Sequence, residues 1–187
     1  HCSNLKTIKL PTVLDTLNVG EFEDCINLES IEIPDNVTAI PSGTFANCFN
    51  LQKISTTGNS KLQFIEAHAF ENCEKITDIY IDSNEILNIE TDAFRSLINL
   101  KNLTLPIKSK FGGLEHNFDG NGMERFTILS DDADNLGGYD LYELIRIIVE
   151  TSRLSPTVRL QVTLPENIDS GILSDITSIV ENRAATY

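Results

Sequence analysis

The sequence is short of basic residues: 14 Lys and Arg stand against 28 Asp and Glu, which gives a formal net charge of −14. Binding to duplex nucleic acid requires Lys and Arg side chains that neutralise phosphates. The balance therefore argues against a nucleic-acid partner, and equally against docking on an anionic lipid surface. It favours either simple solubility or a partner with a basic surface.

Long hydrophobic runs are also missing. No stretch approaches the roughly 18 consecutive apolar residues that indicate a membrane-spanning helix, so we expect no membrane insertion within this chain. The apolar fraction is nonetheless 41%, which excludes a disordered chain. A length of 187 residues is enough for one sizeable domain, or for one domain with an appendage.

Closely spaced cysteine pairs, from which zinc sites are usually built, are absent. Cys2, Cys25, Cys48 and Cys73 lie instead at one position of a repeated pattern, and Leu97 takes that position in a further copy. A free cysteine behaves as a small hydrophobic residue that is commonly buried. We therefore expect a ladder of reduced cysteines in the core, and no cofactor.

What the sequence does contain is one pattern, repeated from residue 2 to residue 106. It runs Phe, two residues, Cys or Leu, two residues, Leu or Ile, two residues, Ile or Leu, one residue and a further apolar residue, often followed by Pro. Copies begin at Phe22, Phe45, Phe70 and Phe94, in steps of 23, 25 and 24 residues, and the chain opens inside an earlier copy. A period of about 20 to 29 residues with this pattern is typical of a leucine-rich repeat solenoid.

Each copy predicts one turn of a coil, which makes about five turns. The Leu-x-x-Ile-x-Ile part alternates and is rich in β-branched residues, so it predicts a short strand. Stacked turns would form a parallel β-sheet with the Leu and Ile side chains inward. Segments 37–40 and 62–65 carry a second short apolar pattern, and the Phe side chains should fill the interior. No copy can bury its apolar face alone, so stability must come from stacking.

These repeats resemble the BspA-type leucine-rich repeat family, whose consensus is similar to Phe-x-x-Cys-x-x-Leu-x-x-Ile-x-Ile-Pro followed by an Ile and an Ala-Phe. The match is close at the cysteines, at Leu10-Pro11, at Ile33-Pro34 and over residues 37–45, and loose over residues 12–21. The family is known from surface proteins of bacteria and of some protists. The resemblance implies adhesion or protein recognition at an extracellular or cell-surface location, and it implies no catalysis.

The pattern changes after Pro106. Residues 107–122 predict a loop, and residues 126–129 predict a strand that would continue the solenoid, because Phe126 falls 23 residues after Leu103. A helix over 140–154, an alternating strand over 158–164 and a second amphipathic helix over about 172–180 follow. We divide this α/β fold into a solenoid, 1–106, and a C-terminal extension or cap, 107–187, which we expect to be continuous with the solenoid rather than a separate domain.

One loop of the extension partly matches a calcium-binding loop. Asp132, Asp134, Gly137 and Glu143 fit positions 1, 3, 6 and 12 of the 12-residue pattern. Leu136, at the fifth position, has no side-chain oxygen, and the segment before the loop predicts a strand where a helix is required. We therefore favour the alternative, an acidic loop that leads into a capped helix.

The main candidate for a functional site is the solvent side of the predicted sheet. Polar side chains from five copies lie between the inward Leu and Ile positions: Lys6, Lys9, Glu29, Glu32, Lys53, Ser55, Asp78, Tyr80, Lys101 and Thr104. Solenoids use such extended faces to bind partners. Tyr80 is the single aromatic among them, although binding hot spots favour aromatic residues and Arg. An ordinary solvated face is the alternative.

Two functions fit this pattern. The first is a non-catalytic protein-recognition or adhesion module of a larger surface or secreted protein. The second is a structural component or rigid spacer of a large assembly, such as a virion or a cell envelope. An enzyme is not expected, because His1, His68 and His116 are far apart in the sequence and no cysteine is predicted to be accessible as a nucleophile. The first residues already fit the internal consensus, so we expect a piece of a longer protein.

Overall fold

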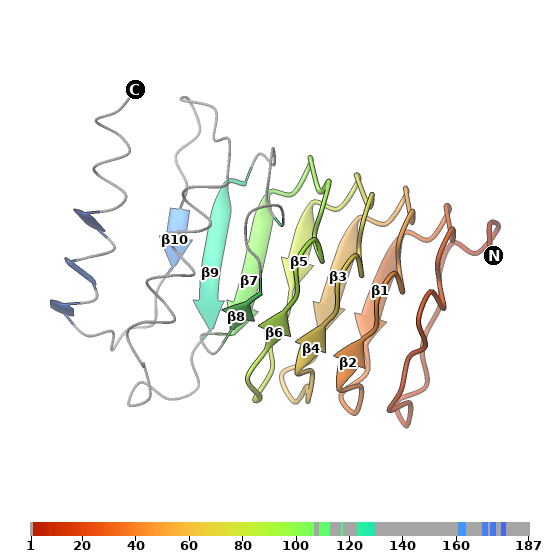
Figure 1. The fold of residues 1–187 in the computed structure, drawn as a ribbon, viewed down its shortest axis with the longest axis horizontal. Coiled ribbons are helices and arrows are strands. Elements are labelled where there is room, and N and C mark those ends of the chain that lie inside the picture. Colours follow the sequence, from red (N-terminus) through yellow and green to blue (C-terminus); the bar gives the residue numbers. More distant parts are fainter. Residues whose placement is uncertain are drawn as a thin grey trace.

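The computed structural model describes residues 2–106, 109–112, 117, 123–129, 161–163, 170–171, 173–174 and 177–178. Most of these residues form turns that lie side by side, and four successive turns each pass through a larger and a smaller β-sheet (Figure 1). The predicted parallel-sheet solenoid is therefore confirmed. The division of the chain into domains at residue 106 stays a prediction.

The larger sheet contains six strands within the described residues, in the order β1-β3-β5-β7-β9-β10, and every neighbouring pair is parallel. A parallel bridge between Thr7 and Ser30 carries the same pairing into the first copy of the repeat. The strands are β1 (Ser30–Ile33), β3 (Lys53–Thr56), β5 (Asp78–Tyr80), β7 (Asn102–Pro106), β9 (Arg125–Leu129) and β10 (Gln161–Thr163).

The smaller sheet contains four strands in the described part of the chain, paired in parallel in the order β2-β4-β6-β8. Two of them lie in the second apolar patterns that were expected at 37–40 and 62–65. The strands are β2 (Ala39–Ile40), β4 (Phe64–Ile65), β6 (Asn88–Ile89) and β8 (Lys110–Phe111).

The core lies between the two sheets. Alternate residues of strands β1 to β7 and of β9 point inward, so in-register partners such as Ile31, Ile54 and Ile79 are at most 2% exposed. One inward position holds a polar residue, Thr56, whose hydroxyl accepts a hydrogen bond from the Asp82 N–H at 2.7 Å and donates one to the Asp82 carbonyl at 2.9 Å. Both hydrogen bonds offset the cost of burying this hydroxyl.

A column of phenylalanine rings fills the interior, as predicted. The rings of Phe22, Phe45, Phe70 and Phe94 stack with centroids 5.3, 5.2 and 5.8 Å apart and interplanar angles of 2°, 6° and 18°. All four side chains are buried. Each ring therefore packs against the rings of neighbouring turns, which ties the stability of one turn to the next.

The backbone bends sharply on both sides of each Phe. The residue two positions before it and the residue two positions after it have positive φ, from 58° to 65°. Gly, Asn and Asp adopt this left-handed conformation most easily, which explains why these residue types recur there. The positions are Gly20, Gly43, His68 and Asp92 before the ring, and Asp24, Asn47, Asn72 and Ser96 after it.

Three of the four cysteines form the predicted core ladder. Cys25, Cys48 and Cys73 are free thiols with no exposed surface. The Cys48 and Cys73 thiols donate to carbonyls of the preceding turn at 3.2 and 3.0 Å, and burial raises the pKa of the Cys73 thiol well above its ordinary value. Cys2 is different: it is exposed, because no described turn stacks on its outer side.

This difference predicts how the thiols react. In the native protein we expect a thiol reagent such as Ellman's reagent to modify Cys2 rapidly and the other three cysteines only on unfolding, because the reagent needs an accessible thiolate. A Cys2→Ser variant should show no rapid reaction in buffer and three thiols in denaturant. Rapid modification of a second thiol in the native wild type would contradict the buried ladder.

The solenoid continues past Pro106, as the 23-residue offset predicted. Strand β9 pairs with β7 so that Phe126 lies beside Leu103, and Met123 is fully buried at the position where the previous copy has Leu100. Strand β10 lies in the predicted alternating segment and pairs with β9, and the six described residues between 170 and 178 are helical. The predicted helix over 140–154 lies outside the described residues, and the extension as a whole stays a prediction.

Candidate binding surface

The outer face of the larger sheet carries its side chains in columns, because the strands pair in register. Three columns, which we call the grid, run across the turns. The first holds Lys6, Glu29, Gln52, Thr77, Lys101 and Glu124, linked by main-chain hydrogen bonds of 2.8–3.0 Å. The second holds Ser30, Lys53, Asp78, Asn102 and Arg125, and the third Glu32, Ser55, Tyr80, Thr104 and Thr127.

The structure brings the predicted site residues onto this one face. Nine of them lie in the grid, and Lys9 lies beside it, two residues after Thr7, which is bridged to Ser30. Ser55, Asp78 and Thr104 are half-buried and the other seven are exposed. Their role in binding stays a prediction. Sequence reasoning missed Glu124, Arg125 and Thr127, because Met and Phe replace Leu and Ile in their copy.

Charges of opposite sign face each other across neighbouring turns. Lys6 lies beside Glu29 in the first column and Lys53 beside Asp78 in the second. In the first column the Lys101 ammonium also lies 3.1 Å from the Glu124 carboxylate. Exposed ion pairs such as this contribute little to stability. The alternation of charges is therefore more relevant to recognition by a partner than to folding.

The grid also differs in charge from the rest of the described chain. Together with Lys9 it holds five of the nine described Lys and Arg residues but four of the sixteen described Asp and Glu residues. The remaining described basic residues are Lys61, Lys75, Arg95 and Lys110. The face is therefore almost neutral, with closely spaced charges of both signs, whereas the other surfaces of the described turns are acidic.

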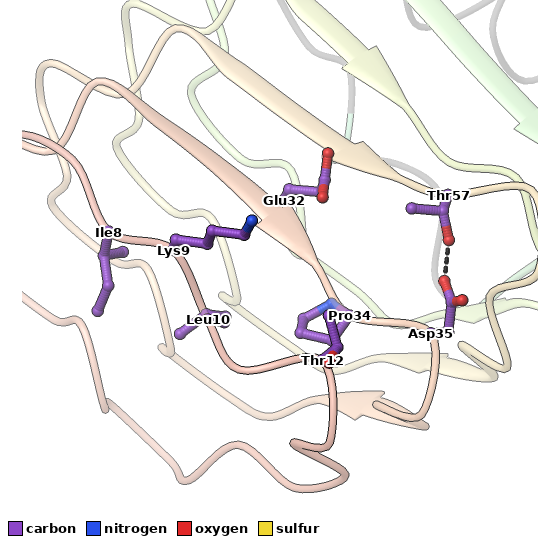
Figure 2. A pocket seen from close by; sticks show the side chains of 8 residues that line it. All are labelled: Ile8, Lys9, Leu10, Thr12, Glu32, Pro34, Asp35 and Thr57. Atoms are coloured by element: carbon purple, nitrogen blue, oxygen red, sulfur yellow. Dashed lines mark hydrogen bonds between the residues drawn. The ribbon is translucent and has the colours of Figure 1, made fainter.

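An open pocket of about 410 Å³ adjoins the grid at the end of strand β1. Figure 2 shows Lys9 from the first turn, Glu32 and Asp35 from the second and Thr57 from the third around it. The Thr57 hydroxyl donates a hydrogen bond to the Asp35 carboxylate. Sequence reasoning missed Asp35 and Thr57 because both follow their strands and lie outside the alternating pattern.

Two further expectations concern metals and membranes. The calcium candidates Asp132, Asp134 and Glu143 lie outside the described residues, so a calcium site stays a prediction. Among the residues that the structure describes, no group of three or more His, Cys, Asp or Glu side chains could hold a metal ion. In the described part of the chain, no helix is long and apolar enough to cross a bilayer.

Solved structures of leucine-rich repeat proteins are similar to this chain. A T. pallidum leucine-rich repeat protein matches with a TM-score of 0.55 and 18% identity over 91% of this chain and 81% of that one. A leucine-rich cell surface protein of Faecalibacterium prausnitzii is 25% identical over 54% of this chain and 29% of its own, with a TM-score of 0.40. A leucine-rich repeat protein of Bacteroides ovatus is 19% identical over 87% of this chain and 52% of its own, with a TM-score of 0.33.

The likeness to the T. pallidum protein supports the solenoid fold. No curated protein sequence matches the chain, and the chain spans less than a third of the F. prausnitzii protein. The sequence pattern of the BspA type leucine-rich repeat region matches residues 1–130 in six copies. The chain therefore belongs to the BspA-type leucine-rich repeat family.

Proposed function

We propose that the chain is a non-catalytic protein-recognition module that binds its partner through the grid, within an extracellular or cell-surface protein that serves adhesion. The observation that carries this proposal is the charge distribution. The grid gathers closely spaced side chains of both signs on one stiff face, while the other described surfaces are acidic. Alternating charges favour a partner with the complementary pattern and disfavour others.

The rigidity of the sheet supports the same proposal. In-register pairing fixes the spacing between neighbouring residues of a column at about 4.8 Å, so little conformational entropy is lost when a partner docks. Tyr80 is 39% exposed and lies in the third column between Ser55 and Thr104. An exposed Tyr near the middle of a contact face is a good anchor for binding energy.

The experiment compares the wild type with two triple variants that carry the same kinds of substitution. The grid variant is Lys53→Glu, Asp78→Lys and Tyr80→Ala. The control variant is Lys61→Glu, Glu85→Lys and Phe64→Ala, which alters exposed residues on the side of the smaller sheet. Each protein, immobilised at equal density after its melting temperature is checked, is incubated with a surface extract of cells from its own environment.

We expect the wild type and the control variant to capture the same partner, and the grid variant to capture about a tenth as much or less, since loss of one anchor residue alone commonly weakens binding at least tenfold. Equal capture by the grid variant would place the binding site elsewhere. If the wild type captures no protein, the alternative function, a rigid spacer or assembly component built on the continuous phenylalanine stack, is favoured.

A further inference from the structure

We propose that the pocket at the end of strand β1 binds one arginine side chain of the protein partner. The inference rests on the proposed function and states the chemistry of the partner at one point of the contact. The pocket is built by three successive turns, so its shape depends on the same stacking that fixes the grid. Its volume of about 410 Å³ lies in the range of sites that hold a small group.

The charge of the lining favours a cation. Glu32 and Asp35 bring two carboxylates to the pocket, and Lys9 brings one ammonium group. Lys9 is not among the ion-paired side chains of the described part of the chain, so it does not neutralise Glu32 directly. An incoming anion would meet two carboxylates at short range, whereas an incoming cation meets an excess of negative charge within a chain whose net charge is −14.

The hydrogen-bonding pattern favours a guanidinium group in particular. Asp35 is held in place by the Thr57 hydroxyl, which uses one of the roughly four acceptor positions of a carboxylate. Glu32 offers a second carboxylate three residues earlier in the same turn. A guanidinium group has five N–H donors in a planar fork, and it can therefore donate to two carboxylates at once.

The apolar part of the lining suits the rest of an arginine side chain. Ile8 and Pro34 line the pocket next to the charged residues. Long basic side chains commonly lay their methylene groups on apolar surface while the charged end contacts polar groups. A small inorganic cation would make no use of this surface, so the lining as a whole fits a side chain better than a metal ion.

The test uses short peptides and the full 187-residue chain labelled with nitrogen-15. One peptide is acetyl-Gly-Gly-Arg-Gly-Gly-amide, and its control has citrulline in place of arginine, which keeps the shape and removes the charge. We expect the arginine peptide to shift the amide signals of Glu32, Asp35 and Thr57 in a saturable way. Its affinity should exceed that of the citrulline peptide by about tenfold, as charge-assisted hydrogen bonds allow.

Variants show whether the pocket itself is responsible. The double substitution Glu32→Gln and Asp35→Asn removes both charges and keeps an acceptor for Thr57, and it should abolish saturable binding. Glu74→Gln removes one exposed charge outside both the grid and the pocket and should leave binding within about twofold of the wild type, since screening weakens charges outside the pocket. Lys9→Ala removes the competing cation and should strengthen binding of the arginine peptide.

Several outcomes would overturn the inference: no saturable shift, equal affinity for citrulline, shifts that map elsewhere, or binding that survives the double substitution. A lysine peptide that binds better than the arginine peptide would overturn the choice of guanidinium. None of these outcomes decides the proposed function, because the grid variant alters Lys53, Asp78 and Tyr80 and leaves the pocket intact. If the grid variant loses capture of the partner and the arginine peptide does not bind the pocket, the proposed function stands and the arginine site is wrong.

Discussion

Phe45→Ala is expected to lower the free energy of unfolding by about 3–5 kcal/mol, the range for truncating a large aromatic side chain in a core. Phe45 has no exposed surface, and its ring stacks on Phe22 at 5.3 Å and on Phe70 at 5.2 Å. Removing it leaves a cavity between two turns that cannot close, because the paired strands on either side hold the turns at a fixed spacing. The measurement is equilibrium unfolding in urea, followed by circular dichroism.

Phe49→Ala provides the matched control. Phe49 belongs to the same turn and undergoes the same chemical change, but it is 45% exposed, so we expect a loss of less than about 1 kcal/mol. The urea dependence of the unfolding free energy should be compared as well, since repeat proteins can lose cooperativity when one interface weakens. Similar losses for the two variants would show that the phenylalanine stack does not hold the turns together.

The repeat pattern was sufficient to predict most of the coil. Spacing alone indicated the parallel sheet, the inward Leu and Ile positions and the phenylalanine column, because a solenoid turn has one solution that buries its apolar residues against its neighbours. The pattern predicted burial for all four cysteines and was wrong for Cys2. A repeat position fixes the direction of a side chain, but its burial requires turns stacked on both sides.

Other features could not be read from the pattern because they depend on contacts between turns. The positive φ values beside each Phe are visible in the sequence only as a loose preference for Gly, Asn and Asp. The sixth copy was only partly recognised, because Met123 and Phe126 take positions that Leu and Ile hold elsewhere. The positions of the grid residues up to Thr104 followed from the alternation, although Ser55, Asp78 and Thr104 are half-buried. The pocket needs Asp35 and Thr57, which the strand pattern does not include.

Asn117 shows most clearly what a sequence pattern leaves out, since it falls in the segment that was predicted to be a loop. In the earlier turns, the N–H of each stacked Phe donates to a main-chain carbonyl of the next turn: Phe22 to Thr44 at 2.8 Å and Phe45 to Ala69 at 2.9 Å. The Phe94 N–H donates instead to the side-chain oxygen of Asn117, also at 2.9 Å. A side-chain amide thus replaces a main-chain carbonyl in the ladder between turns.

The same amide makes a second hydrogen bond, from its nitrogen to the Glu90 carbonyl at 3.0 Å, and Asn117 is 1% exposed. Asn117→Ala removes both bonds. The buried Phe94 N–H loses this acceptor, at a cost of about 1–3 kcal/mol, whereas the carbonyl of the exposed Glu90 still accepts from the Ala93 N–H at 3.3 Å. We therefore expect the free energy of unfolding to fall by about 1–3 kcal/mol. Urea unfolding of the variant and the wild type gives the difference.

Asn99→Ala is the control for this substitution. Asn99 also donates to a main-chain carbonyl of another turn, that of Glu74 at 2.8 Å, but it is exposed, so water can replace the lost bond and the loss should stay below about 1 kcal/mol. If Asn117→Ala costs no more than Asn99→Ala, its amide does not act as a ladder carbonyl. A larger loss for Asn117→Ala would mean that one buried side chain joins the fourth phenylalanine turn to the chain that follows it.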